Sequence, residues 1–334
     1  MEKREVLKIF AYGSELRNAI DKITKAGRGA LIIMVNSQKL KNICSGGFRI
    51  DHVLTEEKLA ELAKLDGAIL VDENFKKILY ANVLVTPDIK KINSDETGTR
   101  HQAAERTAKQ FETLALAVSE KTKIATIYYK NKKLKLSTLN ELFTKTGDAL
   151  KILEKHEEIF QELIKKFDVS EILELVTMDD IVLIFQRKKI IDFVSDIVSM
   201  YLAELGKEGK LIELQLKEGM NFIHREINLM IKDYEEYLNF DSIIKDLEKL
   251  QYDDVLDKEV LFKIFLSRKK SDEQLVPKGY RTLRNIPILS EDNISQIVAE
   301  FHSLKKLMLV DEGELKKILG ERKTRSVKEY LLKF

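Results

Sequence analysis

The hydrophobic pattern of this chain changes completely near residue 137, and that change limits the folds open to it. Before this point, short apolar runs such as Ala30–Val35 and Ala68–Val71 alternate with amphipathic runs such as Leu16–Ala26 and Glu56–Leu65. Strand patterns that alternate with helical patterns predict a central sheet with helices on its faces. We therefore expect an α/β domain with a mixed central sheet over residues 1–137.

The pattern after residue 137 is helical. From about 138 to 270 the strand signals vanish, and apolar residues such as Leu150, Leu153, Phe160 and Ile164 recur at helical spacing. This periodicity predicts a helical bundle or spine. From about Pro277 onward, shorter helical runs are interrupted by turns. The predicted fold class is therefore α+β and multidomain, with a helical linker domain over 138–272 and a domain of short helices over 273–334.

Composition excludes several classes of protein. The chain has 57 basic and 55 acidic residues and a net charge of +2, so nucleic-acid binding would need a local basic patch. The single cysteine, Cys44, cannot form an internal disulfide and fits a reducing compartment. The first residues lack an apolar signal core, and the apolar runs are too short to cross a bilayer. We therefore expect a cytoplasmic protein without a membrane partner.

Two short strings within the first 137 residues predict a phosphate site. Asp66-Gly67-Ala68 lies between a helical run and an apolar run, so it reads as a helix-to-strand turn. A carboxylate there can hold a metal ion or activate a hydroxyl, and Gly67 lets backbone approach a ligand closely. Gly98-Thr99-Arg100-His101 opens a helical run, with Thr99 as the expected N-cap. Free N–H groups at a helix start, beside Arg100 and His101, attract anions.

Two other features allow both a functional and a structural interpretation. Ser119 follows a predicted strand, at the end where ligands bind on such sheets, but a plain turn residue is equally compatible with the pattern. The last domain carries the basic residues Lys278, Arg281, Arg284, Arg322, Lys323 and Arg325. Short helices with cations and free amides at their turns can hold a phosphate backbone without reading sequence. An oligomerisation or capping domain with a solvated basic face would give the same pattern.

Short motifs follow one another in a fixed order across the three predicted domains. They are Gly13-Ser14-Glu15-Leu16-Arg17, Gly46-Gly47-Phe48, Leu65-Asp66-Gly67-Ala68-Ile69, Tyr80-Ala81-Asn82-Val83, Thr97-Gly98-Thr99-Arg100-His101, Glu204-Leu205-Gly206 and Lys278-Gly279-Tyr280-Arg281. This ordered set resembles the diadenylate cyclases, and within them the group that carries a helical linker and a DNA-binding tail. The last motif resembles the start of that group's helix-hairpin-helix domain. One such string is a weak signal, whereas the ordered set across three domains is specific.

This resemblance implies that two ATP molecules condense to cyclic di-AMP and two pyrophosphates between two facing domains. Asp66 would hold Mg²⁺ or Mn²⁺ and help to deprotonate the attacking hydroxyl, while Arg100 and His101 would neutralise the leaving pyrophosphate. The resemblance also implies a homo-octamer, a nucleoid location and the sensing of branched or damaged DNA. The implied ATP-binding residues are Gly67, Ala68, Val85, Thr99, Arg100, His101, Gln102, Ala103 and Ser119; the implied DNA-binding residues are Lys278, Arg281, Arg284, Gly320, Arg322, Lys323 and Arg325.

The sequence departs from the family pattern at two places. Gln102 stands where the family carries a third basic residue, which removes a charge and a bidentate phosphate contact. Ile318-Leu319-Gly320 replaces the family's Gly-Ile-Gly, which removes one glycine from a turn expected to meet phosphates. We expect weaker triphosphate binding or slower turnover from the first change and weaker DNA binding from the second. The alternative is a nucleotide-binding DNA scaffold or sensor with weak or lost cyclase activity.

Overall fold

The computed structural model describes residues 2–35, 45–271 and 273–332, and Cys44 lies outside these ranges. The chain forms two compact units. One contains Met1–Thr146 together with Met200–Leu211, and the other contains Gly147–Ser199 together with Ile212–Phe334. No helix among the described residues is long and apolar enough to span a membrane.

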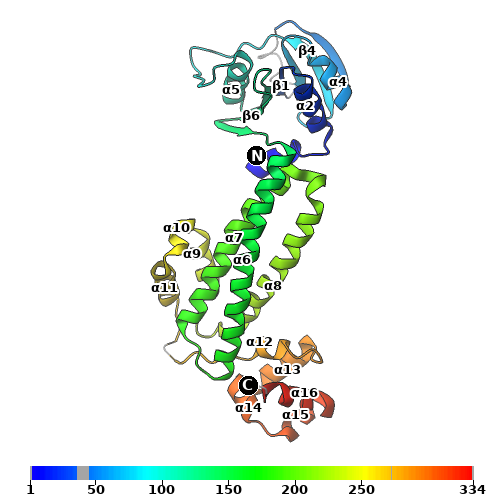
Figure 1. Cartoon of the computed structure of the whole chain (residues 1–334). Helices are drawn as coiled ribbons and strands as arrows, with labels where there is room; N and C mark the ends of the chain where they lie inside the picture. The colour runs from blue at the N-terminus through cyan, green and yellow to red at the C-terminus, as the bar shows by residue number, and fades with distance from the viewer. Residues whose placement is uncertain (1, 36–44, 272, 333–334) are drawn as a thin grey trace. The chain divides into compact units, whose positions relative to one another are not determined.

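The first unit is built on a seven-stranded sheet in the order β2-β4-β3-β1-β5-β6-β7. β1 and β3 run parallel and the other neighbouring strands run antiparallel, so the predicted mixed sheet is confirmed. Figure 1 shows the sheet between its helices. The elements are α1 Lys3–Ile9, α2 Glu15–Lys25, β1 Ala30–Met34, β2 Phe48–Val53, α4 Glu56–Leu62, β3 Ala68–Val71, β4 Lys77–Val83, α5 Thr99–Phe111, β5 Leu114–Val118, β6 Ala125–Tyr129 and β7 Lys132–Lys135.

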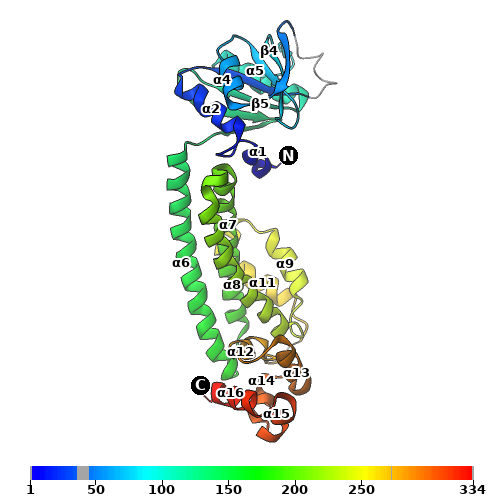
Figure 2. The same cartoon turned by 90° about the vertical axis from the view of Figure 1, so that its right-hand side faces the viewer.

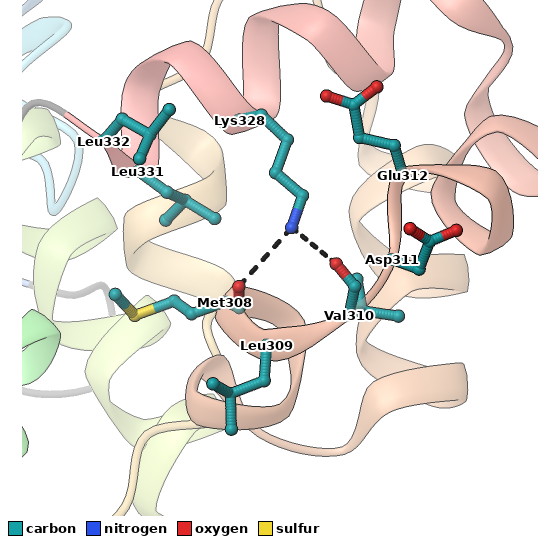
Figure 3. Close-up of a pocket in the computed structure, with 8 residues that line it drawn as sticks. All are labelled: Met308, Leu309, Val310, Asp311, Glu312, Lys328, Leu331 and Leu332. Atoms are coloured by element: carbon teal, nitrogen blue, oxygen red, sulfur yellow. Dashed lines mark hydrogen bonds between the residues drawn. The ribbon is translucent and has the colours of Figure 1, made fainter.

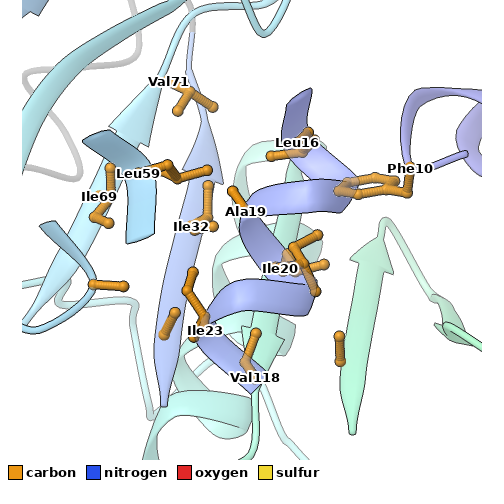
Figure 4. Packing of buried hydrophobic residues seen from close by; sticks show 14 of the residues in the cluster. Phe10, Leu16, Ala19, Ile20, Ile23, Ile32, Leu59, Ile69, Val71 and Val118 are labelled. Carbon is orange, nitrogen blue, oxygen red and sulfur yellow. The ribbon is translucent and has the colours of Figure 1, made fainter. Parts of the chain in front are cut away.

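Alternation along the strands divides the core between the two faces of the sheet. Ile32 and Ile69 pack under α2 and α4, together with Ile20, Ile23 and Leu59 (Figure 4). Leu31, Ile33, Ala68 and Leu70, which alternate with these residues along β1 and β3, face α5 on the opposite side of the sheet. Four alanines, Ala104, Ala108, Ala115 and Ala117, form much of that second contact. Their small side chains let α5 lie close to the sheet, which fixes where the start of α5 is held.

The sequence pattern missed α1 and β2. Most residues of β2 are exposed, because β2 is an edge strand that pairs with β4 alone. Phe48-Arg49-Ile50-Asp51 alternates apolar and polar residues, but a register shift between Arg49 and His52 ends the alternation after four residues. So short a pattern is a weak signal for a strand.

The second unit consists of helices, and we call it the helical unit and the first unit the sheet unit. Figures 1 and 2 show that α6, α7 and α8 run side by side along much of their length. The helices of the rest of the chain are α6 Leu139–Ile172, α7 Met178–Leu205, the 3₁₀ helix Gly206–Gly209, α8 Lys210–Tyr234, α9 Phe240–Glu248, α10 Tyr252–Leu256, α11 Lys258–Ser267, α12 Tyr280–Arg284, α13 Glu291–Phe301, α14 Leu304–Leu309, α15 Glu312–Leu319 and α16 Glu321–Leu331.

The last five helices share one apolar core. Leu283, Ile297, Leu315 and Val327 are buried in it, and Ile172 at the end of α6 joins the same cluster. α12 packs against α13, and α15 packs against α16. The short helices predicted after Pro277 are therefore confirmed, as the five helices α12 to α16.

Candidate active site and basic tail

Strand register brings the predicted site residues of the first unit to one end of the sheet. Ile32 of β1 lies beside Ile69 of the parallel β3, which places the starts of these two strands together. The antiparallel neighbours contribute their ends, since Val83 pairs with Ala68 and Val118 pairs with Ala30. The segments just outside those residues contain Asp66, Gly67, Val85 and Ser119. The structure thus gathers at one sheet end the residues that the sequence predicted separately.

The Asp66 turn has the geometry of a close-approach loop. Gly67 has φ +82°, and a Cβ there would lie 2.8 Å from the carbonyl oxygen of Val83. Only glycine fits this conformation without strain. Ala68 is fully buried and begins β3, while Asp66 is exposed. Among the described residues, nothing forms an ion pair or hydrogen bond with the Asp66 carboxylate, which is therefore available to a ligand.

The start of α5 presents unsatisfied N–H groups. Its N-cap is Gly98 and not Thr99, so that prediction is wrong by one residue, and no side chain caps the helix. The N–H of Gln102 is the first to close the helical ladder, on the carbonyl of Gly98 at 2.8 Å. The N–H groups of Thr99, Arg100 and His101 precede it, and the first turn of a helix lacks carbonyl partners for them. This arrangement suits an anion.

Arg100 lies over the start of β1. A Cβ on Gly29 would overlap its guanidinium, so glycine at that position makes room for the side chain. Arg100 is 37% exposed and contacts Glu120 at 3.5 Å. This exposed, long ion pair is weak, and an incoming phosphate can displace it. Ser119 precedes Glu120 and accepts a hydrogen bond from the N–H of Thr122 at 3.1 Å. Ala103 and Val85 pack at the edge of the core under α5.

Gln102 supports a loop in this structure. Its Nε2 donates to the carbonyl of Glu96 at 2.7 Å, and its Oε1 accepts from Arg106 at 3.4 Å. Arg106 Nε in turn donates to the carbonyl of Ile92 at 3.1 Å. Gln102 and Arg106 together tie the segment from Ile92 to Glu96 to α5.

Sequence reasoning missed three residues that shape this site. Gly29 makes room for Arg100, and Tyr128 and Glu96 contact each other beside His101. The signal for Tyr128 is its place in a strand that the sequence predicts, because a buried tyrosine hydroxyl needs a polar partner. Glu96 lies two residues before Gly98, and its role depends on the fold of the loop.

A divalent cation would fit here only with help from its substrate. No group of three or more metal-ligating side chains lies together in the described part of the chain. Mg²⁺ binds through one or two carboxylates and completes its shell with water and phosphate oxygens. The free Asp66 carboxylate beside an anion site matches that donor set.

Arg281 corrects the prediction for the basic tail. Its side chain is 1% exposed and makes an ion pair with Asp168 of α6. Glu171 and Glu226 lie 3.8 and 3.7 Å from the same guanidinium. The N–H groups of Gly279, Tyr280 and Arg281 donate to the Asp233 carboxylate of α8. The prediction that Arg281 contacts DNA is wrong, because four acidic side chains enclose it; its run of basic neighbours did not reveal this burial.

The enclosed acids make stability depend on pH. Burial raises the pKa of Glu171 to about 8, against an attraction to Arg281 that lowers it. Because this folded-state pKa lies above the ordinary value, Glu171 contributes stability below the ordinary value, and this is lost as pH rises through about 8. We expect the helical unit to melt at a lower temperature at pH 9 than at pH 6, and Glu171→Gln to flatten that slope. Calorimetry across pH measures this; an unchanged slope in Glu171→Gln would contradict it.

The other tail residues differ in how available they are. Lys278 is 16% exposed between Glu235 and Glu236, Lys323 donates to Asn293, and Arg325 pairs with Glu329. Arg284 is half-exposed and lies 3.7 Å from Glu291. Gly320 is exposed with φ +76° and caps α16. Arg322 is exposed, and within the described ranges its guanidinium has no partner.

One further lysine of the tail is directed into its own fold. Lys328 donates to the carbonyls of Met308 at 3.4 Å and Val310 at 2.6 Å (Figure 3). These contacts line a hollow that also contains Leu309, Leu331 and Leu332. Because its ammonium group is hydrogen-bonded to carbonyls at the end of α14, Lys328 contributes little to a basic surface.

Comparison with known proteins agrees with this architecture. Residues 17–133 match the family model for the DisA bacterial checkpoint controller nucleotide-binding domain, and residues 136–274 match the model for the linker region of the same controller. The chain is 33% identical to the DNA integrity scanning protein DisA of Bacillus subtilis over 99% of this chain and 93% of that protein. It is 35% identical to the protein of the same name from Acetivibrio thermocellus, over 95% of this chain and 89% of that protein. This chain therefore belongs to the DisA family, with a nucleotide-binding domain of the diadenylate cyclase type followed by the family's linker region.

Proposed function

We propose that this protein is a diadenylate cyclase that condenses two ATP molecules into cyclic di-AMP and two pyrophosphates. The observation that carries the proposal is the sheet end that holds the free Asp66 carboxylate together with the uncapped start of α5. Arg100 and His101 belong to the first turn of that helix. A carboxylate beside a strong anion site is what attack on a triphosphate requires.

The reaction needs two copies of the site. In each half-reaction the 3′-oxygen of one ATP forms a bond to the α-phosphorus of the other, and the bond from that phosphorus to pyrophosphate breaks. Asp66 accepts the proton of the attacking hydroxyl. The amides of the α5 first turn, Arg100 and His101 stabilise the departing charge. One domain offers one such set, so two domains must face each other, and an octamer would pair every domain.

Asp66 is the residue that would hold Mg²⁺ or Mn²⁺, with triphosphate oxygens completing the shell. When bound, the cation would supply charge neutralisation at the reacting phosphates. Gly67 and Ala68 would form the floor below the nucleotide, and Val85, Thr99, Gln102, Ala103 and Ser119 would line its rim.

The direct test is incubation of the full chain with ATP and either cation, followed by chromatography of the products. We expect cyclic di-AMP and pyrophosphate in a ratio of one to two. ATP binding without cyclic product would favour the alternative, a nucleotide-binding DNA sensor. One observation favours that alternative. The Gln102 side chain is neutral, and its amide is hydrogen-bonded to the Glu96 carbonyl and to Arg106, so position 102 offers no cation to a phosphate.

We also propose that the last five helices are a helix-hairpin-helix domain that binds the DNA backbone. Support comes from the α15–α16 hairpin, where Gly320 leaves the first turn of α16 without a side-chain cap. Free amides there, beside Arg322, suit a phosphate. Binding would be to branched or damaged DNA in the nucleoid, and the ion pairs of Lys278 and Arg325 predict modest affinity.

Arg322→Ala tests the DNA proposal without disturbing the fold. We expect weaker binding to both junction and linear DNA, and a slope of log affinity against log salt that is smaller by about 1. Mobility-shift titrations at several salt concentrations measure this. Arg49→Ala, which removes an exposed arginine from β2 of the other unit, is the control. Equal binding by Arg322→Ala and wild type would exclude this hairpin as the contact.

A further inference from the structure

A chain of hydrogen bonds runs from His101 into the sheet. His101 Nδ1 lies 2.8 Å from the hydroxyl of Tyr128 on β6. That hydroxyl donates to Glu96 Oε1, also at 2.8 Å, and Lys133 of β7 makes an ion pair with the same carboxylate. Tyr128 is 1% exposed, so its hydroxyl has no access to bulk water. Gln102 holds the backbone of Glu96 in place.

The direction of these hydrogen bonds determines which nitrogen of His101 carries the proton. A tyrosine hydroxyl has one hydrogen, and here it is given to the carboxylate, which can only accept. The hydroxyl oxygen must therefore accept from Nδ1–H of the imidazole. In a neutral imidazole, Nε2 is then the bare nitrogen. The ring edge at Cδ2, which is bonded to Nε2, lies beside Gly98, since a Cβ there would be 3.5 Å from it. The bare nitrogen is thus on the side of the ring away from Tyr128.

We propose that Tyr128 and Glu96 are positioning residues for His101, which hold Nδ1 protonated and let Nε2 take up a proton when a triphosphate reaches the start of α5. This inference rests on the proposed function for its substrate. The Glu96 charge, transmitted through the Tyr128 hydroxyl, stabilises the imidazolium, which then donates from Nε2 to a phosphate oxygen. The proton comes from solvent, and no bond other than this hydrogen bond is formed.

The charges around the ring agree with a histidine that is neutral until an anion arrives. Burial lowers the pKa of His101, Glu96 opposes this shift, and Lys133 adds to it. Burial alone would raise the pKa of Glu96, but Lys133 and Tyr128 outweigh it and keep the carboxylate ionised. Glu105, one turn along α5, faces Tyr128 and Glu96 and completes the set of titratable groups there.

The first test reads the tautomer and does not depend on catalysis. Nitrogen NMR of the full chain with labelled histidine, assigned with His101→Gln among the five histidines, reports which nitrogen carries the proton. We expect Nδ1–H in wild type and loss of that preference in Tyr128→Phe. Tyr129→Phe removes the neighbouring hydroxyl, on the opposite face of β6, and should leave the signal unchanged. An Nε2–H tautomer in wild type would overturn the proposal.

The second test reads the pH dependence of ATP use. The ratio of KM between variant and wild type cancels the titration of ATP itself. For Tyr128→Phe and Glu96→Gln we expect the ratio to be smallest at the acid end of the pH range, where His101 is protonated with or without ATP. The ratio should rise to about tenfold near neutral pH, because there the variants lose a charge-assisted hydrogen bond to the imidazolium that forms with ATP. A merely structural role would raise the ratio equally at all pH values. Glu96→Gln preserves size and keeps the test valid if Tyr128→Phe does not fold.

The two proposals fail in different ways. If wild type binds ATP but forms no cyclic product, the cyclase proposal fails. The ratio of the dissociation constants for ATP, measured across pH, then still tests the positioning role of Tyr128 and Glu96. If cyclic di-AMP forms but both the tautomer and the pH dependence are unchanged in Tyr128→Phe, the positioning role is wrong and the cyclase proposal stands.

Discussion

Asp66→Asn is expected to reduce the rate of cyclic di-AMP formation by at least about a thousandfold while ATP still binds. Asparagine keeps the size of the side chain but can neither accept the proton of the attacking hydroxyl nor supply the charge that a divalent cation needs. The triphosphate contacts, at the start of α5, remain intact. Product analysis gives the rate, and calorimetric titration with ATP gives the affinity.

Asp51→Asn is the matched control for this substitution. Asp51 is also an exposed aspartate of the sheet unit, and its ion pair is with Arg49 on the edge strand β2. We expect this variant to retain wild-type turnover. Cyclase activity in Asp66→Asn within tenfold of wild type would show that Asp66 is not the base and that another residue at that sheet end accepts the proton.

Arg281→Met should destabilise the helical unit by about 3–5 kcal/mol, the cost expected when one partner of a buried ion-pair network is removed. Methionine fills similar space, so the loss is electrostatic: Asp168 and Glu226 lose their shared cation. The Asp233 contacts to the backbone of α12 remain. Calorimetry should show a lower melting temperature for the helical unit and an unchanged transition for the sheet unit.

Arg284→Met is the control for Arg281→Met. It removes an arginine from the same short helix, but one that is half-exposed and whose nearest carboxylate is 3.7 Å away. Surface pairs of this kind contribute about 1 kcal/mol or less. Equal stability losses in the two variants would mean that the buried acids are neutralised in some other way, for example by protonation. Because two units unfold, the two transitions should be analysed separately.

The candidate cyclase site was largely predictable from the sequence. Asp66-Gly67-Ala68 and Gly98-Thr99-Arg100-His101 both carry strong local signals: a turn before an apolar run and a helix start with basic residues. Their proximity was not readable, because it depends on the register that places Ala68 beside Val83 and Ala30 beside Val118. Tyr128 was missed for the same reason, since it meets His101 from a strand 27 residues later in the chain. Glu96 is near His101 in the sequence, but its contact with Tyr128 depends on the fold of the loop before α5.

The basic tail shows the opposite case, in which a local signal was misleading. Arg281 and Arg284 are three residues apart in a basic run, yet one is enclosed by acids from α6 and α8 and the other is half-exposed. Composition reports that a charge exists but not which way the side chain points. Asp168, Glu171, Glu226 and Asp233 belong to helices more than forty residues earlier in the chain, so no local pattern links them to Arg281.

By itself, the sequence determined the alternation of strands and helices before residue 137, the helical character of the rest, and the two strings that form the candidate site. These features depend on periodicity and turn chemistry, which act over a few residues. Only the tertiary structure decided which strand ends meet, which side chain His101 Nδ1 contacts, and which arginine of the tail is buried. Those outcomes depend on strand register and on the burial of charges from distant helices, and both are set by the packing of the whole unit.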